Sequence, residues 1–458
     1  MKIIICGAGQ VGYGIAEKLA QEDNEVSVID TSASLVAAIS DKLDVRGFVG
    51  HGAHPDVLAR AGADQADMII AVTLHDEINM IACEVAHGLF NVPTKIARIR
   101  AQNYLQPEYS NLFNRDNLPI DVTISPEIEV GKMVLRRISF PGAIDVFRFA
   151  EETISLVAIE CLEDCPVVNT PLKQLSQLFP DLVSTVVGIF RRGKLFVAHS
   201  DEQIEVGDVA YVISQREHVR RLLGLFGHDE QAASRIIIAG GGNIGHYVAR
   251  SIEATQPRTR VKLIESDRDR AVMLSQQLDH TIVLNGSALD QAMLNQADVA
   301  DADLMVSLTN NDQINILSAV MAKQHGCRNS MALINNAPLQ QMAEALGIDA
   351  FINPRAVTIS RVLQHVRKGR IRSVYSVQQG AGEVIEAEAL ETSPLVGKPI
   401  RELDLPEGIR LGAIYRAGTV HRPDGDFKIK ARDRVVLLAS AQAVRTVEQL
   451  FRVSIQYF

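Results

Sequence analysis

Residues 2–12 read KIIICGAGQVG, and residues 235–245 read RIIIAGGGNIG. In each stretch a short apolar strand runs directly into the glycine pattern G-x-G-x-x-G, and the two patterns begin 233 positions apart. A strand that leads into this pattern and then into a helix is typical of a Rossmann-type dinucleotide-binding domain. The two copies predict a chain built from two nucleotide-binding halves.

Further matches between the halves indicate that the whole chain is duplicated. Thr73 matches Thr309 at an offset of 236, and Arg191 matches Arg416 at an offset of 225. The offset changes slowly along the chain, as a few insertions and deletions in loops would make it change.

The order of predicted elements gives the fold class. Continuous apolar strands alternate with helical patterns, which predicts a parallel sheet covered on both faces. In the first half, strands are expected at residues 3–6, 25–30, 45–50, 68–72 and 94–99, and the first helix is expected at residues 10–21. Shorter alternating strands between residues 143 and 226 predict a small α+β subdomain. We therefore predict an α/β chain with two Rossmann-type doubly wound parallel-sheet domains, at 1–140 and 234–370, followed by α+β subdomains at 141–226 and 371–458.

Composition limits the partners. The 458 residues carry a formal net charge of -9, which argues against nucleic-acid binding. No apolar run approaches the ~20 residues that span a bilayer, and the strand that begins at Lys2 predicts that no signal peptide is present. We expect a cytoplasmic protein without direct membrane insertion. The five cysteines lack the spacing of a metal site, so we predict neither a metal nor a disulfide.

The glycine turns are the predicted phosphate sites. The first glycine allows a tight turn, the second lets the backbone approach a pyrophosphate, and the third lets the helix pack closely on the sheet. The phosphates then lie at a helix N-terminus, where free N–H groups attract anions. The predicted residues are Gly7, Ala8, Gly9, Gln10, Val11 and Gly12 in the first half and Gly240, Gly241, Gly242, Asn243, Ile244 and Gly245 in the second.

Each half also has an acidic residue at the end of its second strand. Asp30 lies 23 positions after Gly7, and Glu265 lies 25 positions after Gly240. A carboxylate there accepts hydrogen bonds from adenosine ribose hydroxyls and repels a 2′-phosphate, which favours NAD(H) over NADP(H). A glycine turn can merely join a strand to a helix, but two complete copies favour binding.

Polar residues follow the fourth strand of each half. Because ligands of doubly wound sheets bind at the carboxyl ends of strands, we expect Thr73 with Leu74, and Thr309, to lie near the ligand. We expect Asp76 and Asp312 to cap the helices that follow. We also expect Asn79 and Asn315 to hold the first turns of those helices.

An arginine distinguishes the halves. Arg98 and Arg100 end the fifth strand of the first half, where Arg98 could pair with a phosphate or could be solvated or ion-paired. The second half has no arginine at this place. We expect the two sites to differ in ligand preference or affinity.

The order of these motifs resembles a family of domains that regulate potassium conductance, the RCK or KTN family. In the Rossmann-type domains the resemblance rests on both glycine patterns and on Asp30, Gly52, Asp56, Ala66-Asp67, Thr73, Asp76, Glu77, Asn79 and Arg98. In the small subdomains it rests on Thr170-Pro171-Leu172, Arg191-Arg192-Gly193-Lys194, Gly207-Asp208, Ser393-Pro394-Leu395, Arg416-Ala417-Gly418 and Arg432-Asp433.

The resemblance implies a non-enzymatic regulatory subunit that binds NAD(H), with ATP or ADP as alternatives. It further implies a protein that docks on the inner face of the cell membrane through a potassium transporter of the Trk type, and a homotetramer. The lack of an Arg98 counterpart puts equal nucleotide occupancy of the two halves in doubt.

Two other functions remain as alternatives. An NAD-dependent oxidoreductase would need an acid–base residue facing the nicotinamide, and neither small subdomain repeats a histidine that could serve, so we predict no catalytic residue. A nucleotide-sensing transcription regulator is disfavoured by the acidic balance and by the lack of a spare helix-turn-helix segment.

Overall fold

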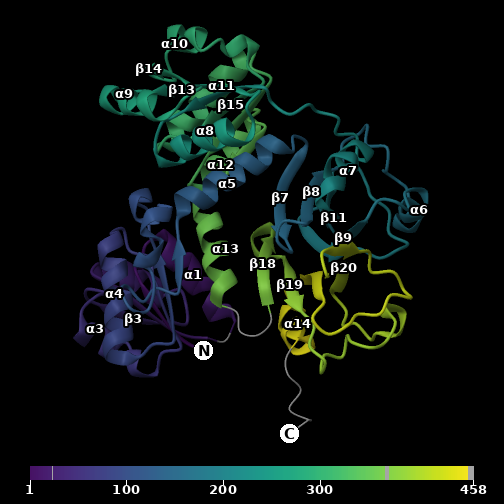
Figure 1. Cartoon of the computed structure of the whole chain (residues 1–458), viewed down its shortest axis with the longest axis horizontal. Coiled ribbons are helices and arrows are strands. Elements are labelled where there is room, and N and C mark those ends of the chain that lie inside the picture. Colours follow the sequence, from purple (N-terminus) through teal and green to yellow (C-terminus); the bar gives the residue numbers. More distant parts are fainter. Residues whose placement is uncertain (23, 367–370, 452–458) are drawn as a thin grey trace. The chain divides into compact units, whose positions relative to one another are not determined.

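A computed structural model describes residues 1–22, 24–366 and 371–451 (Figure 1). Residues 1–132 and 234–366 form one compact unit, and residues 133–233 form a second unit with the segment that begins at residue 367. The predicted domain boundary at 370 falls outside the described residues, and the other predicted boundaries stay predictions.

The first unit contains two doubly wound parallel sheets with the same strand order, which confirms the predicted fold class. The first sheet, in spatial order, consists of β3 (Arg46–Val49), β2 (Glu25–Asp30), β1 (Lys2–Cys6), β4 (Met68–Ala71), β5 (Thr94–Arg98) and β6 (Val122–Ile124). The second sheet consists of β14 (Ile282–Asn285), β13 (Arg260–Glu265), β12 (Arg235–Ala239), β15 (Leu304–Ser307), β16 (Asn329–Leu333) and β17 (Ala350–Ile352).

The first sheet has one strand more than the five that the sequence predicts, and the second sheet has a short strand at the matching edge. The additional strands, β6 and β17, have only three residues each, too few to show a period of apolar positions. The order of strands reverses beside β1 and β12, so the glycine turns that follow these two strands lie at the switch point where doubly wound sheets bind ligands.

Helices cover these sheets. In the first half they are α1 (Gln10–Gln21), α2 (Ala33–Ser40), α3 (Pro55–Arg60), α4 (Asp76–Phe90) and α5 (Pro126–Ser139). In the second half they are α8 (Asn243–Thr255), α9 (Arg268–Gln277), α10 (Gln291–Gln296), α11 (Asp312–Gln324), α12 (Ala337–Ala345) and α13 (Pro354–Val366). The helix predicted over residues 10–21 has the bounds that we expected.

The last helix of the second half packs on the first half. On α13 the apolar residues Ile359, Val362, Leu363 and Val366 recur at helical spacing and join the core around β1 and α1. In Figure 1, α13 (green) lies beside α1 (purple). The helix α5 of the first half approaches α8 of the second, where a Cβ added at Gly131 would lie 2.3 Å from the Tyr247 ring. The halves therefore exchange helices.

The second unit contains two antiparallel sheets, as the predicted α+β subdomains require. One consists of β7 (Ala143–Phe149), β8 (Ile154–Glu160), β9 (Ser184–Arg191), β10 (Lys194–Val197) and β11 (Val209–Gln215), with helices α6 (Leu172–Leu178) and α7 (Val219–Leu225). The other consists of β18 (Ile371–Val377), β19 (Gly382–Glu388), β20 (Ile409–Arg416), β21 (Thr419–His421) and β22 (Arg434–Ser440), with helix α14 (Val444–Leu450). The two sheets share one apolar core.

A matched ion pair in the two subdomains supports the duplication. The guanidinium of Arg191 donates to the buried Asp208 at 2.7 and 2.6 Å. Arg416 donates to the buried Asp433 at 2.8 and 2.6 Å. Bidentate geometry of this kind makes a buried carboxylate tolerable, because both of its oxygens accept charge-assisted hydrogen bonds.

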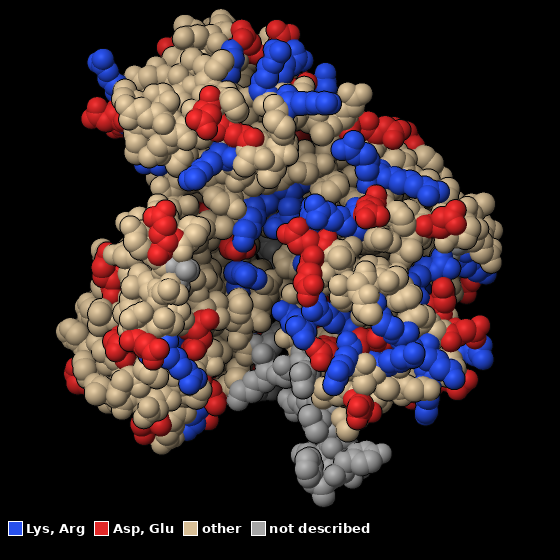
Figure 2. All heavy atoms as spheres, in the orientation of Figure 1, with Lys and Arg blue, Asp and Glu red and all other residues tan. Residues whose placement is uncertain are grey.

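Acidic and basic side chains are interspersed over the face of the molecule in Figure 2. Within the described residues, no helix has the length and apolar character that crossing a membrane requires. In the same part of the chain, no three His, Cys, Asp or Glu side chains lie close enough to share a metal ion.

Candidate nucleotide-binding site

The carboxyl ends of the two parallel sheets open into a cavity of about 1240 Å³. Both halves line it, and all of its lining residues belong to the first unit. Both glycine turns and both acidic strand-end residues are among them. The cavity is large enough for two nucleotide-sized ligands, because typical ligand pockets have roughly 300–1,000 Å³.

The glycines fit the roles that the sequence predicts for them. Gly7 and Gly240 have φ values of 114° and 100°, which side chains rarely adopt. A Cβ at Gly12 or Gly245 would lie 1.8 or 2.0 Å from the carbonyl oxygen of the first glycine, so helix and turn are in direct contact.

The middle glycines leave open space. A Cβ added at Gly9 or Gly242 would meet no atom within 4 Å, although both residues line the cavity. Their backbone φ values of -66° and -58° suit any residue. Glycine is therefore not needed there by the protein itself, and the space fits the close approach of a phosphate to a helix N-terminus.

The acidic residues hold the glycine turns in place. The Asp30 carboxylate accepts hydrogen bonds from the backbone N–H groups of Ala8 at 2.7 Å and Ser32 at 2.8 Å. The Glu265 carboxylate accepts from Gly241 and Asp267, both at 2.8 Å. A carboxylate has about four acceptor positions, so each retains capacity for ligand hydroxyl groups.

The asparagines lie in the first turns of α4 and α11 and hold these turns as expected, because each amide binds the ends of two strands. Asn79, fully buried, accepts from the Thr73 backbone and hydroxyl at 2.8 and 2.7 Å, and donates to the carbonyl of Arg98 at 2.9 Å. Asn315 makes the same bonds to Thr309 and donates to Leu333 at 2.8 Å. Each amide thereby positions the ends of the fourth and fifth strands.

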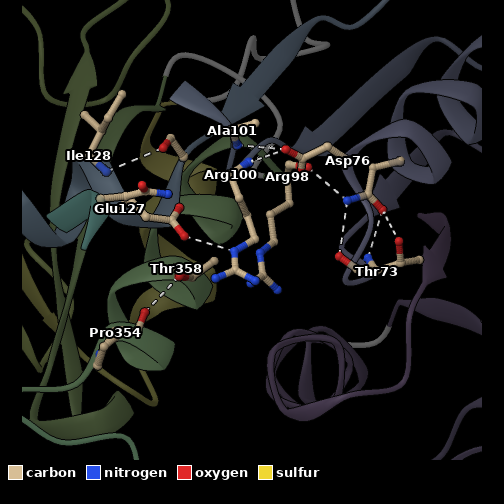
Figure 3. Close-up of polar contacts among 12 residues, drawn as sticks. Thr73, Asp76, Arg98, Arg100, Ala101, Glu127, Ile128, Pro354 and Thr358 are labelled. Carbon is tan, nitrogen blue, oxygen red and sulfur yellow. Dashed lines mark hydrogen bonds and ion pairs between the residues drawn. The ribbon is translucent and has the colours of Figure 1, made fainter. Parts of the chain in front are cut away.

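The prediction that Asp76 and Asp312 cap helices was wrong. The Asp76 carboxylate accepts from the backbone of Arg100 at 2.9 Å and Ala101 at 2.8 Å (Figure 3). Asp312 accepts from the backbone of Asn335 at 3.0 Å, and the cap of α11 is Asn311. Both aspartates therefore fix the loop that follows the fifth strand.

The two arginines of the first half lie side by side in Figure 3 but have different partners. Arg100 donates to Glu127 at 2.9 Å. Arg98 lines the cavity, and its buried Nε has no hydrogen-bond partner. Burial, followed by the charge of Arg100, lowers the pKa of Arg98. A buried donor without an acceptor suits a site that an anion completes.

The second half places its arginine differently. Arg270 follows Glu265 by five positions, and Leu35 occupies the same place after Asp30. The Arg270 Nε donates to the carbonyl of Gly241 at 2.6 Å, and its Nη2 lies 3.4 Å from Asn243 Oδ1. This arginine therefore stabilises the turn itself. The sequence did not predict Arg270 as a site residue, because nothing in the repeat marks its position.

Most of the predicted binding residues line the cavity, and four do not: Ala8, Gly12, Gly241 and Gly245. Ala8 and Gly241 instead bind the acidic residues through their backbone, and the other two contact the turn. Two further residues, Glu127 and Arg355, line the cavity from the exchanged helices α5 and α13 and were not predicted from the sequence.

Comparisons with known proteins identify both repeats. The TrkA-N domain family matches residues 3–126 and 236–354, and the TrkA-C domain family matches residues 156–227 and 384–452. The Trk system potassium uptake protein TrkA of Azorhizobium caulinodans is 57% identical over 458 residues, with 100% of each chain covered.

Solved structures share the fold at low identity. The GsuK channel bound to NAD has a TM-score of 0.60 at 16% identity, covering 98% of this chain and 78% of that chain. A structure of GsuK bound to ADP has a TM-score of 0.50 at 15% identity, covering 80% of this chain and 70% of that chain. At these identities the likeness concerns the tandem fold alone.

Proposed function

The chain belongs to the family of Trk system potassium uptake proteins TrkA, and from this premise we propose that nucleotides bound at its two glycine turns regulate potassium flux through a membrane transporter. The protein acts from the cytoplasmic face as a peripheral subunit, assembled as a homotetramer. The observation that carries the proposal is the single cavity into which both glycine turns open.

NAD(H) is the proposed ligand, with ATP or ADP as alternatives. The acceptor capacity left on Asp30 and Glu265 suits the ribose hydroxyls of any of these nucleotides. The solved relatives bound to NAD and to ADP support the choice of class.

The arrangement of the cavity suits regulation. Because both halves line one cavity, a ligand that binds one arrangement of the halves more tightly shifts the population toward it. Coupling of this kind is typically worth about 1–3 kcal/mol per site, and several sites in a homotetramer would act together. An oxidoreductase is disfavoured, because the full-length relative is named as a potassium uptake protein.

The open space at the middle glycines gives a direct test. Gly9→Asp and Gly242→Asp place a carboxylate where the phosphate would lie, and the Cβ meets no atom of the protein. Calorimetric titration of the full chain with NADH, NAD, ATP and ADP should show loss of one site per substitution. Potassium uptake in cells should lose its response to nucleotide in the double variant.

Gly88→Asp is the matched control, because Gly88 also faces open space but lies on α4 outside the cavity. It should leave binding and uptake unchanged. Unaltered binding of all four nucleotides in the Gly9→Asp/Gly242→Asp chain would contradict the proposal. Oxidation of NADH by the purified chain with a panel of keto acids would favour the oxidoreductase instead.

A further inference from the structure

We propose that Arg355, a residue of the second half, binds the phosphates of the nucleotide held by the first half. This inference rests on the proposed function and deepens it. It makes the first site a shared site, which selects its ligand by phosphate charge and connects the two halves through that ligand.

The exchanged helix α13 brings Arg355 to the first site. The helix begins at Pro354 and packs along α1, the helix that follows the first glycine turn. A Cβ added at Gly14 of α1 would lie 3.7 Å from the Arg355 Nη2. Arg355 lines the same cavity as Gly9 and Gln10. The guanidinium is therefore close to the end of α1 where phosphates are expected.

The charge of Arg355 has no partner among the residues that the structure describes. The side chain is half-buried, and it makes no hydrogen bond or ion pair with any residue in the described ranges. Arg98 in the same cavity has a buried Nε without an acceptor, whereas Arg100 is compensated by Glu127. Two guanidinium groups with donors left free by the described residues, in a cavity that a helix N-terminus also lines, form a strong site for phosphate oxygens.

The reciprocal helix has a residue of opposite charge at the matching position. The helix α5 begins with Pro126 and Glu127, where α13 begins with Pro354 and Arg355. Glu127 is used by Arg100 and adds no cation to the second site. The helix exchange therefore adds a positive charge to the first site alone, so the first site should distinguish ligands by their number of phosphates more strongly than the second.

A simpler explanation is that Arg355 only covers Gly14 and supports the packing of α13 on α1. In that case its removal would lower stability and weaken every ligand equally. Binding to phosphate predicts instead a loss that grows with the number of phosphates, because each added phosphate brings more charge near the guanidinium.

The test uses the full chain carrying Gly242→Asp, which leaves only the first site open. ATP, ADP and AMP are titrated by calorimetry against this chain with and without Arg355→Ala. We expect the affinity for ATP to fall roughly tenfold to a hundredfold, the range expected for a charge-assisted contact, and that for AMP to fall less than about threefold. Arg355→Lys should recover part of the ATP affinity.

Arg258→Ala is the matched control, because it removes one exposed positive charge from the second half outside the cavity. It should change none of the three affinities. Equal loss for ATP and AMP, or no loss in Arg355→Ala, would overturn the inference while leaving the proposed function intact. If the unsubstituted chain bound no nucleotide at all, the proposed function itself would fail.

Discussion

The two glycine turns share a backbone frame but differ in how their arginines are used. In the first half, the buried Nε of Arg98 has no acceptor. In the second half, Arg270 donates to the carbonyl of Gly241 within the turn itself. Both arginines line the cavity, but the Nε of Arg98 is available to a ligand, whereas that of Arg270 already binds the turn.

This difference separates what the fold needs from what a ligand needs. Bonds that shape the turns occur in both halves: a carboxylate bound to the turn and a buried asparagine bridging two strand ends. The charged side chains that face the cavity differ between the two halves. A duplicated frame can therefore hold two sites with different ligand preferences.

The largest expected effect is a loss of stability on substitution of the third glycine of each turn, and it should be the same in both halves. Gly12→Ala and Gly245→Ala each place a Cβ within about 2 Å of a carbonyl oxygen of the turn. We expect each to lower the free energy of unfolding by about 3 kcal/mol, at the upper end for overpacking. Urea denaturation measures it, with the exposed helical Gly88→Ala as a control that should be neutral or stabilising. A loss in one half only would contradict the shared frame.

A second matched pair tests the strand bridge. Asn79→Ala and Asn315→Ala each remove a fully buried amide and leave backbone groups of two strand ends unpaired. We expect each to cost about 2 kcal/mol of unfolding free energy. Asn295→Ala, on the exposed surface of α10, should cost nothing measurable. Denaturation curves with similar midpoints for all three variants would count against the role of the bridge.

A third pair of substitutions, at Arg98 and Arg270, should change the stability of the chain in opposite directions. Arg98→Met removes a partly buried charge whose Nε has no acceptor among the described residues, so the ligand-free chain should gain up to about 1 kcal/mol of stability. Nucleotide affinity at the first site should fall roughly tenfold. Arg270→Met should instead lose about 1 kcal/mol of stability, because the hydrogen bond to Gly241 is lost. Thermal unfolding and calorimetry of both variants measure these changes, and equal changes in stability would remove the distinction.

The smallest expected effect is on the pH dependence of the chain's stability. Burial, then the charge of Arg361, lowers the pKa of His365 on α13 to about 4, and Glu129 opposes this. Since the pKa of an unfolded histidine is higher, at about 6.5, protonation favours unfolding. The stability contributed by the neutral ring is therefore lost as the pH falls from about 6.5 toward 4.

Because the His365 ring is partly exposed, we expect the stability lost between pH 7 and pH 5 to be only about 1 kcal/mol. The difference in urea midpoint between pH 7 and pH 5 should shrink in His365→Gln. An unchanged difference in that variant would show that other groups control the pH dependence.

Local patterns predicted the fold well. The apolar runs before the glycine patterns and the helix over residues 10–21 lie where the sequence placed them, because strand and helix periods are properties of neighbouring residues. The repeat predicted that Arg191 and Arg416 correspond. It did not predict their ion pairs with the aspartates 17 positions later.

The errors have one physical origin, which is contact between distant residues. A helix start is a local signal, so Asp76 was interpreted as a cap, whereas its partners lie 24 and 25 positions away. The apolar face of α13 predicts burial but does not identify which sheet it covers. Consequently Arg355 could not be assigned to the first site from the sequence.

The exchanged helix also affects synthesis of the chain. Val362 and Val366 belong to the apolar core around β1 and α1, so this core stays incomplete until the ribosome has released residue 366. At about 5–20 residues per second, that is tens of seconds after the first sheet has emerged. Until then, a nascent first half exposes the apolar surface that α13 later covers. We therefore expect chaperones to bind the nascent chain during this interval of translation, and truncated chains to end within it.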